Sequence, residues 1–171
     1  MIYFIIILLT IYFSSRADLL YENITGVLIT PQYRIYTMIY IIILAWFFGY
    51  KTYKIFQKQQ LPSIYYFTIF ISSLTMTIGA ISPYHLNNND FFSHLHVYCS
   101  MISSISFLIH LFIYFSYLKK SHLMKYNQIF PYYLKGIEFL ILLTIVFGRM
   151  NGYIEILYTI IVCWCLYKIE K

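Results

Sequence analysis

The chain has 171 residues, of which 61% are hydrophobic, 22% aromatic and only 11% charged, with a formal net charge of +6. A soluble domain carries roughly 25% charged residues, because its surface must meet water. With less than half that share, most of this chain's surface must meet lipid. The composition therefore excludes an ordinary soluble domain and indicates an integral membrane protein.

Six apolar runs follow one another along the chain, and each is expected to form a membrane-spanning helix. Such a helix needs about 20 mainly apolar residues, a length that the first, fifth and sixth runs reach only with amphipathic flanks. Pro31, Pro62 and Pro131 are expected to precede helices, and Pro83 to follow one. The predicted spans are residues 1–20, 34–50, 63–82, 94–118, 132–148 and 150–167, with four or five spans as alternatives.

Basic residues alternate between the connections of these spans. By the positive-inside rule, this alternation predicts that both termini are cytoplasmic. The fold class is thus an all-α, six-helix transmembrane bundle, with residues 1–171 as its single domain. We expect the lysine-rich face to bind anionic lipid headgroups rather than nucleic acid. The segments after runs two, four and six carry Lys51, Lys54, Lys58, Lys119, Lys120, Lys125, Lys135, Lys168 and Lys171, whereas the other segments carry only Arg16, Arg34 and Arg149.

The stretch SPYHLNNNDFFSHLHVYC at 82–99 brings polar residues to the opposite, outer face. Histidine and carboxylate side chains suit zinc, so this stretch is a candidate metal site. On a regular helix, however, His96 lies about 200° from His94, so those two side chains would point apart. The alternative is an interfacial loop in which Asn87–Asp90 cap the fourth helix. The candidate metal ligands are His85, Asp90, His94 and His96, and the same four residues with Arg149 and Glu155 form the expected outer-face polar cluster.

The third and fourth spans each carry a polar stripe at helical spacing. The short connection between them makes these helices antiparallel neighbours, so the stripes are expected to face each other. Facing small and hydroxyl residues form interhelical hydrogen bonds in lipid. A histidine inside a membrane helix is in addition a candidate functional residue. The stripes are Thr68, Ser72, Thr75, Gly79 and Ser82 on the third span, and His96, Cys99, Ser103, Ser106 and His110 on the fourth.

The segment YENITGVLITPQYRIY resembles the first-loop signature of a six-span family, that of the damage-regulated autophagy modulators and the FGF-receptor-activating protein. The resemblance implies six spans with the N-terminus inside. It also implies, for eukaryotic members, a lysosomal or Golgi membrane protein tied to autophagy or to GPI-lipid remodelling. The matching residues are Tyr21, Thr25, Gly26, Pro31 and Tyr36, with His96 and Phe107 at the family's positions in the fourth span.

The leading interpretation is a non-catalytic polytopic membrane protein that organises or senses lipids, or a membrane protein partner, through its outer polar cluster. One alternative is a metal-dependent hydrolase that acts on lipid headgroups with outer-face histidine and aspartate. A second is a small transporter in which the two stripes line a path. No cofactor is expected, zinc being the one considered. The expected location is the plasma membrane in a bacterium and an endomembrane in a eukaryote.

Overall fold

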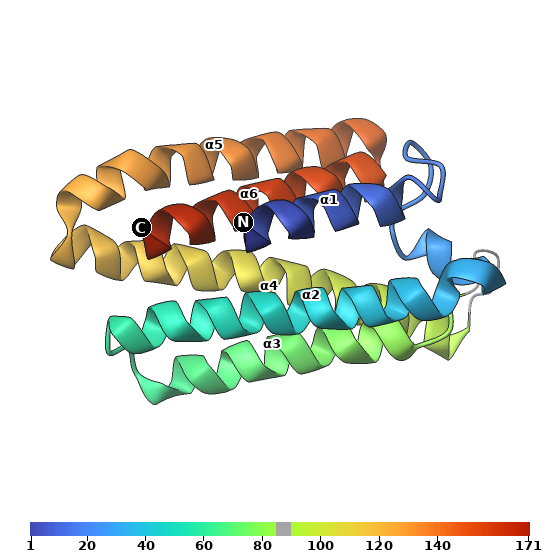
Figure 1. The fold of residues 1–171 in the computed structure, drawn as a ribbon, viewed down its shortest axis with the longest axis horizontal. Coiled ribbons are helices and arrows are strands. Elements are labelled where there is room, and N and C mark those ends of the chain that lie inside the picture. The colour runs from blue at the N-terminus through green and yellow to red at the C-terminus, as the bar shows by residue number, and fades with distance from the viewer. Residues whose placement is uncertain (85–89) are drawn as a thin grey trace. The chain divides into compact units, whose positions relative to one another are not determined.

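The computed structural model describes residues 1–84 and 90–171, and the long elements within them are all α-helices (Figure 1). This confirms the predicted all-α membrane bundle. In chain order the elements are α1 (Ile2–Ser14), a short 3-10 helix η1 (Gly26–Ile29), α2 (Pro31–Lys58), α3 (Ser63–Ile81), α4 (Phe91–Ser121), α5 (Leu123–Phe147) and α6 (Gly152–Glu170).

Helices α2 to α6 are each long and apolar enough to cross a membrane, whereas α1 is shorter. The 13 residues of α1 extend about 20 Å, against a hydrocarbon core of about 30 Å. The prediction that the first span continues to residue 20 is wrong, because α1 ends at Ser14. Beyond it, the Asp18 carboxylate accepts the backbone N–H of Leu20 at 2.9 Å, a local turn that competes with helix continuation.

The fifth helix begins at Leu123, nine residues before its predicted start at 132. The expectation that Pro131 precedes this helix is wrong, since Pro131 lies inside it. Proline lacks an N–H, so the carbonyl of Asn127 loses its intrahelical donor. Asn127 is exposed, so its carbonyl is open to solvent or headgroups. Helices α2 and α4 likewise run past their predicted ends, to Lys58 and Ser121.

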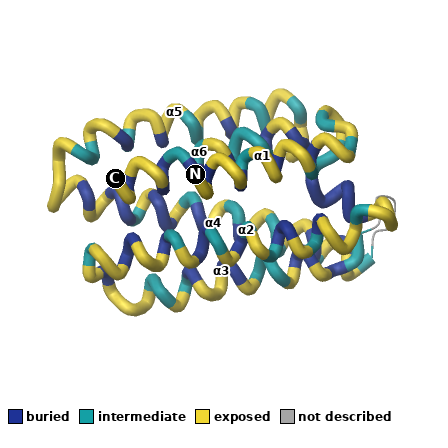
Figure 2. Tube along the Cα trace, viewed as in Figure 1, coloured by how far each residue is buried: buried dark blue, intermediate teal, exposed yellow. Residues whose placement is uncertain are grey.

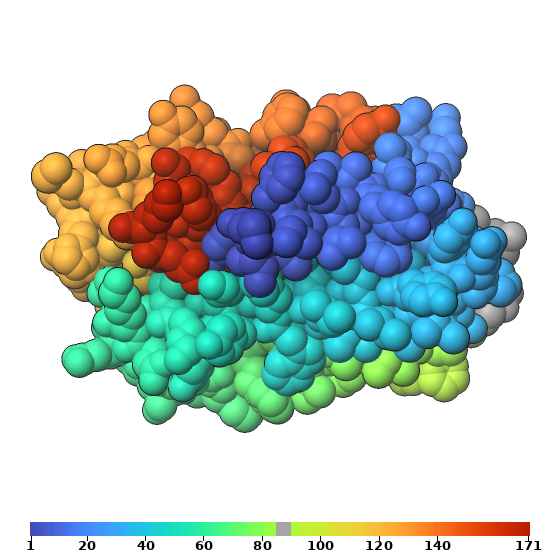
Figure 3. All heavy atoms as spheres, in the orientation of Figure 1, coloured from blue at the N-terminus to red at the C-terminus, as the bar shows by residue number. Residues whose placement is uncertain are grey.

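The chain divides into two compact units. The terminal unit comprises Met1–Thr30 and Leu118–Lys171, and the central unit comprises Pro31–Tyr117. In the terminal unit α1 packs antiparallel along α6, and their side chains touch in the space-filling view (Figure 3). Near one end of this helix pair the rings of Tyr3 and Tyr167 pack edge-on, with their centroids 6.1 Å apart.

The central unit is built from α2, α3 and most of α4. Helices α2 and α3 pack closely at Gly49, where an added Cβ would lie 2.2 Å from Ser73 Oγ. A tight turn joins the two helices, with the Leu61 N–H donating to the carbonyl of Phe56 at 3.1 Å. Within this turn Gln60 has a left-handed backbone, φ 52°. This is the helix-ending geometry that glycine usually occupies.

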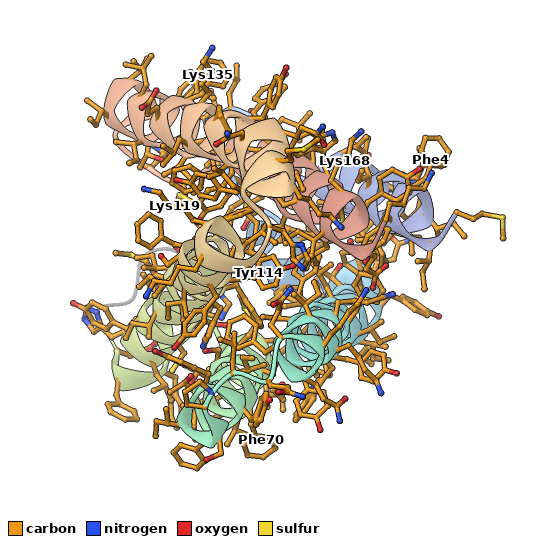
Figure 4. All side chains as sticks on the ribbon, turned by 90° about the vertical axis from the view of Figure 1, so that its left-hand side faces the viewer. Phe4, Phe70, Tyr114, Lys119, Lys135 and Lys168 are labelled. Carbon is orange, nitrogen blue, oxygen red and sulfur yellow. The ribbon has the colours of Figure 1, made fainter. Side chains whose placement is uncertain are left out.

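Large apolar side chains are exposed on each of the α-helices, and exposed positions recur along the length of each one (Figure 2). Phe4 on α1 is 63% exposed and Phe70 on α3 is 49% exposed, and both point away from their helices (Figure 4). Side chains of this kind on every long helix are expected where lipid, rather than water, surrounds the protein.

Candidate functional site

The two predicted polar stripes meet between α3 and α4. Thr68 Oγ1 and His110 Nε2 share a hydrogen bond of 2.9 Å. One turn further along, the hydroxyls of Ser72 and Ser106 lie 2.6 Å apart. Ser103 adds a third link by donating to the carbonyl of Ser72 at 2.7 Å. These bonds join the two helices over about two turns, through hydroxyl groups of the predicted stripes.

At the end of α3, a histidine of the α4 stripe, His96, caps the helix. His96 Nδ1 lies 2.7 Å from the carbonyl oxygen of Gly79. A carbonyl only accepts, so Nδ1 carries the proton. In a continuing helix this carbonyl would accept from residue 83, but Pro83 has no N–H. His96 therefore supplies the donor that Pro83 lacks.

Close helix approach makes this cap possible. A Cβ on Gly79 would lie only 2.7 Å from Ser100 Oγ and 3.1 Å from the Ser100 backbone nitrogen. The ring of Tyr84 stacks on His96 with centroids 5.0 Å apart. His96 is 1% exposed, and its Nε2 has no hydrogen-bond partner among the described residues. This histidine is a buried structural link between α3 and α4.

Three members of the stripes make other contacts. Thr75 donates its hydroxyl to the carbonyl of Ile71 on its own helix, at 2.7 Å. Ser82 likewise donates to the carbonyl of Ile78, at 2.8 Å. The Cβ of Cys99 lies 3.3 Å from the position that a Cβ on Gly79 would take. The interhelical bonds thus come from a subset of each stripe.

The candidate metal ligands have separate surroundings. Asp90 accepts the backbone N–H of Ser93 at 2.7 Å and so caps α4. His94 is exposed and stacks on Tyr98, with ring centroids 6.0 Å apart. His96 is buried against Gly79, and His85 lies outside the described residues. Within residues 1–84 and 90–171, no three His, Cys, Asp or Glu side chains come together in a way that would hold a metal ion.

The remaining members of the outer cluster, Arg149 and Glu155, lie in the terminal unit and contact the loop after α1. The Glu155 carboxylate accepts the backbone N–H of Ile24. The Arg149 guanidinium lies 5.8 Å from the ring centre of Tyr21. Sequence reasoning identified Glu155 but not its partner, which is 131 residues away. The sequence signal that identified Glu155 was its position as an acidic residue in the first turn of a mainly apolar helix.

Further contacts between this loop and the start of α6 come from the backbone and from Asn151. The Gly152 N–H donates to the carbonyl of Glu22 at 2.8 Å. Asn151 caps α6 by accepting the Ile154 N–H at 3.1 Å, and its amide donates to the Leu20 carbonyl at 3.4 Å. The segment from Leu20 to Ile24 is therefore fastened to the N-terminus of α6 at several points.

The loop residues that carry the family resemblance have local roles. The Asn23 side chain accepts both the Thr25 hydroxyl, at 2.6 Å, and the Gly26 N–H, at 3.0 Å. A Cβ on Gly26 would lie 3.1 Å from the Cβ of Glu22, so glycine suits this close approach. Pro31 is the first residue of α2, where a missing N–H costs no intrahelical bond.

Lysines lie toward the C-terminal ends of α2, α4 and α6. In the terminal unit, Lys119 and Lys120 lie in the last turn of α4, and Lys168 lies in the last turn of α6 (Figure 4). In the central unit, the last turns of α2 carry Lys51, Lys54 and Lys58. These lysines lie near helix C-termini, where they complement the helix dipole, whereas Lys125 and Lys135 lie in the first half of α5.

The helical fold and its apolar exterior define a multi-pass integral membrane protein. No family model matches the chain, and neither a curated protein nor a solved structure matches it. The resemblance to the autophagy-modulator family stays a prediction.

Proposed function

We propose that the chain is a non-catalytic multi-pass membrane protein that binds and organises anionic lipids through its lysine-bearing helix ends. The observation that carries this proposal is the exposure of lysine side chains at the ends of long apolar helices. Lys119, Lys120 and Lys168 are all exposed. Lysines near the membrane surface attract anionic lipids with about 1 kcal/mol each.

The surroundings of the candidate catalytic residues favour a non-catalytic role. Asp90 caps a helix, His96 caps another, and Glu155 holds a loop. Each of these groups has a structural partner that accounts for its position. We therefore assign the proposed lipid binding to the lysines rather than to the outer polar cluster.

The polar stripes favour helix packing over a transport path. Ser103 is fully buried, and its hydroxyl donates to the Ser72 carbonyl. Ser72 and Ser106 bond to each other. Hydroxyl groups paired in this way hold helices together in lipid.

Native mass spectrometry of the detergent-purified protein tests the proposal. The protein is offered an equimolar mixture of phosphatidylglycerol and phosphatidylcholine with matched acyl chains. We expect several-fold more bound phosphatidylglycerol, with a preference that weakens as ionic strength rises. Equal binding of the two lipids at low salt would overturn the proposal.

A further inference from the structure

We infer that the anionic-lipid site lies at one end of the terminal unit, around the turn between α4 and α5, and that it takes the phosphate of an anionic phospholipid. This inference rests on the proposed function and assigns it to particular residues. The residues of this surface, here called the hairpin site, are Lys119, Lys120, Lys168 and Lys171.

A hydrogen bond joins the start of α5 to the end of α6 at the hairpin site. Lys125 Nζ donates to the carbonyl of Ile169 at 2.7 Å. Lys125 lies in the first turn of α5, and Ile169 lies in the last turn of α6, where carbonyls lack intrahelical donors. Because α5 begins two residues after α4 ends, the end of α4, the start of α5 and the end of α6 all lie at the same end of the terminal unit.

Aromatic rings support the ammonium groups at this end. Lys119 Nζ lies 5.8 Å from the ring centre of Tyr126, and Lys171 Nζ lies 4.7 Å from that of Tyr167. Such contacts hold lysine side chains without neutralising their charge. All four lysines of the hairpin site are exposed, and the acidic residue of this segment, Glu170 in the last turn of α6, is exposed as well.

Exposed apolar side chains beside these lysines favour a lipid over a water-soluble anion. Leu123 is 56% exposed and Met124 is 79% exposed in the first turn of α5. Further along the same two helices, the rings of Tyr132 on α5 and Trp164 on α6 pack edge-on, with their centroids 5.6 Å apart. Tyrosine and tryptophan are typical of the membrane–water interface. A phospholipid offers a phosphate to the lysines and acyl chains to the apolar residues.

The lysines of the central unit provide a matched comparison. Lys51, Lys54 and Lys58 are carried by α2 alone. Lys51 and Lys54 lie near the rings of Phe47 and Tyr50, at 5.9 and 5.7 Å. The two lysine sets therefore have similar charge and similar aromatic support, but only the hairpin site combines the ends of two helices.

The experiment compares two triple variants with the wild type in the phosphatidylglycerol and phosphatidylcholine mixture. One variant is Lys119→Gln/Lys120→Gln/Lys168→Gln and the other is Lys51→Gln/Lys54→Gln/Lys58→Gln. Both remove three positive charges, and circular dichroism checks that both stay helical. We expect the first variant to lose most of the phosphatidylglycerol preference and to bind the two lipids about equally, and the second to keep most of the wild-type preference.

The other possible outcomes separate a failure of this inference from a failure of the proposed function. If the α2 variant loses the preference and the hairpin variant keeps it, or if both lose it equally, this inference is overturned while the proposed function stands. If the wild type shows no preference, both fail. Inorganic phosphate is added as a competitor, and complete displacement of lipid at equal concentration would overturn the assignment to a phospholipid. Should the hairpin variant fail to fold, single Lys119→Gln and Lys168→Gln variants replace it, and an unchanged preference in both would overturn the inference.

Discussion

His96 of α4 completes the end of α3 by donating its Nδ1–H to the carbonyl oxygen of Gly79, at 2.7 Å. The need for this donor comes from Pro83, which has no N–H to give and which drives Ser82 into an extended backbone, ψ 130°. Pro83, which lies four residues after Gly79, and His96 on the next helix thus form one structural arrangement.

This relationship predicts a specific pattern of coupling. We expect His96→Ala to lower the free energy of unfolding by about 3 kcal/mol, because it leaves a buried carbonyl unpaired and removes a buried ring. In a Pro83→Ala background, residue 83 regains an N–H, so the same substitution is expected to cost clearly less. Chemical unfolding in detergent, followed by circular dichroism, measures both. Equal costs in the two backgrounds would show that His96 does not replace the missing donor.

The Thr68–His110 bond predicts a smaller coupling. Hydrogen bonds between membrane helices contribute about 0.6 kcal/mol on average, and up to about 1.7. A double-mutant cycle with Thr68→Val and His110→Phe is therefore expected to give a coupling free energy in that range. Thr75 is the matched control, since its hydroxyl bonds within α3. A Thr75→Val and His110→Phe cycle is expected to show no coupling, and a value as large as the first would argue against the assigned contact.

The left-handed backbone of Gln60 predicts a stabilising substitution. A residue with a Cβ costs about 1–2 kcal/mol in this conformation, whereas glycine adopts it freely. We expect Gln60→Gly to raise the free energy of unfolding by about 0.5–1 kcal/mol, after its greater loss of chain entropy is counted. Gln60→Ala, which keeps the Cβ, is expected to change it little. Thermal unfolding midpoints compare the two, and a lower midpoint for the glycine variant would contradict the turn geometry.

The bond between Glu155 and Ile24 predicts a local effect on the loop after α1. Glu155→Leu removes the acceptor for the Ile24 N–H, so we expect faster amide hydrogen exchange across residues 19–26. Glu155→Gln keeps a side-chain oxygen and is expected to retain much of the protection. Glu138→Leu, at an exposed position of α5, serves as the control. Unchanged exchange in the Glu155→Leu variant would show that this contact does not hold the loop.

The sequence predicted the helical class and the pairing of α3 with α4 well, because apolar runs and helical spacing report directly on burial in lipid and on shared faces. Ser72, Ser103 and Ser106 meet as the stripes indicated. Helix ends were harder to predict. The Asp18 turn ends α1 early, and Pro131 lies within α5, since local turns and tolerated prolines follow from detailed surroundings.

Contacts between distant segments could not be predicted from spacing. Glu155 bonds to Ile24, and Lys125 bonds to Ile169, each across a large separation along the chain. In both cases the partner of the charged side chain is a backbone group, which a residue of any type can supply. A single sequence therefore contains no residue pattern that identifies the partner. The division of Asp90, His94 and His96 among a cap, an exposed ring and a buried link likewise depends on where α4 begins.

The central claim, that this protein binds anionic lipids at its lysine-bearing ends, is tested most directly by its stability in the presence of lipid. A ligand that binds the folded state stabilises it by about 1.4 kcal/mol at ten times its dissociation constant. The thermal unfolding midpoint is measured as phosphatidylglycerol replaces phosphatidylcholine at constant total lipid. We predict a saturating rise in the midpoint that high salt reduces. A midpoint that does not change with lipid charge would contradict the claim.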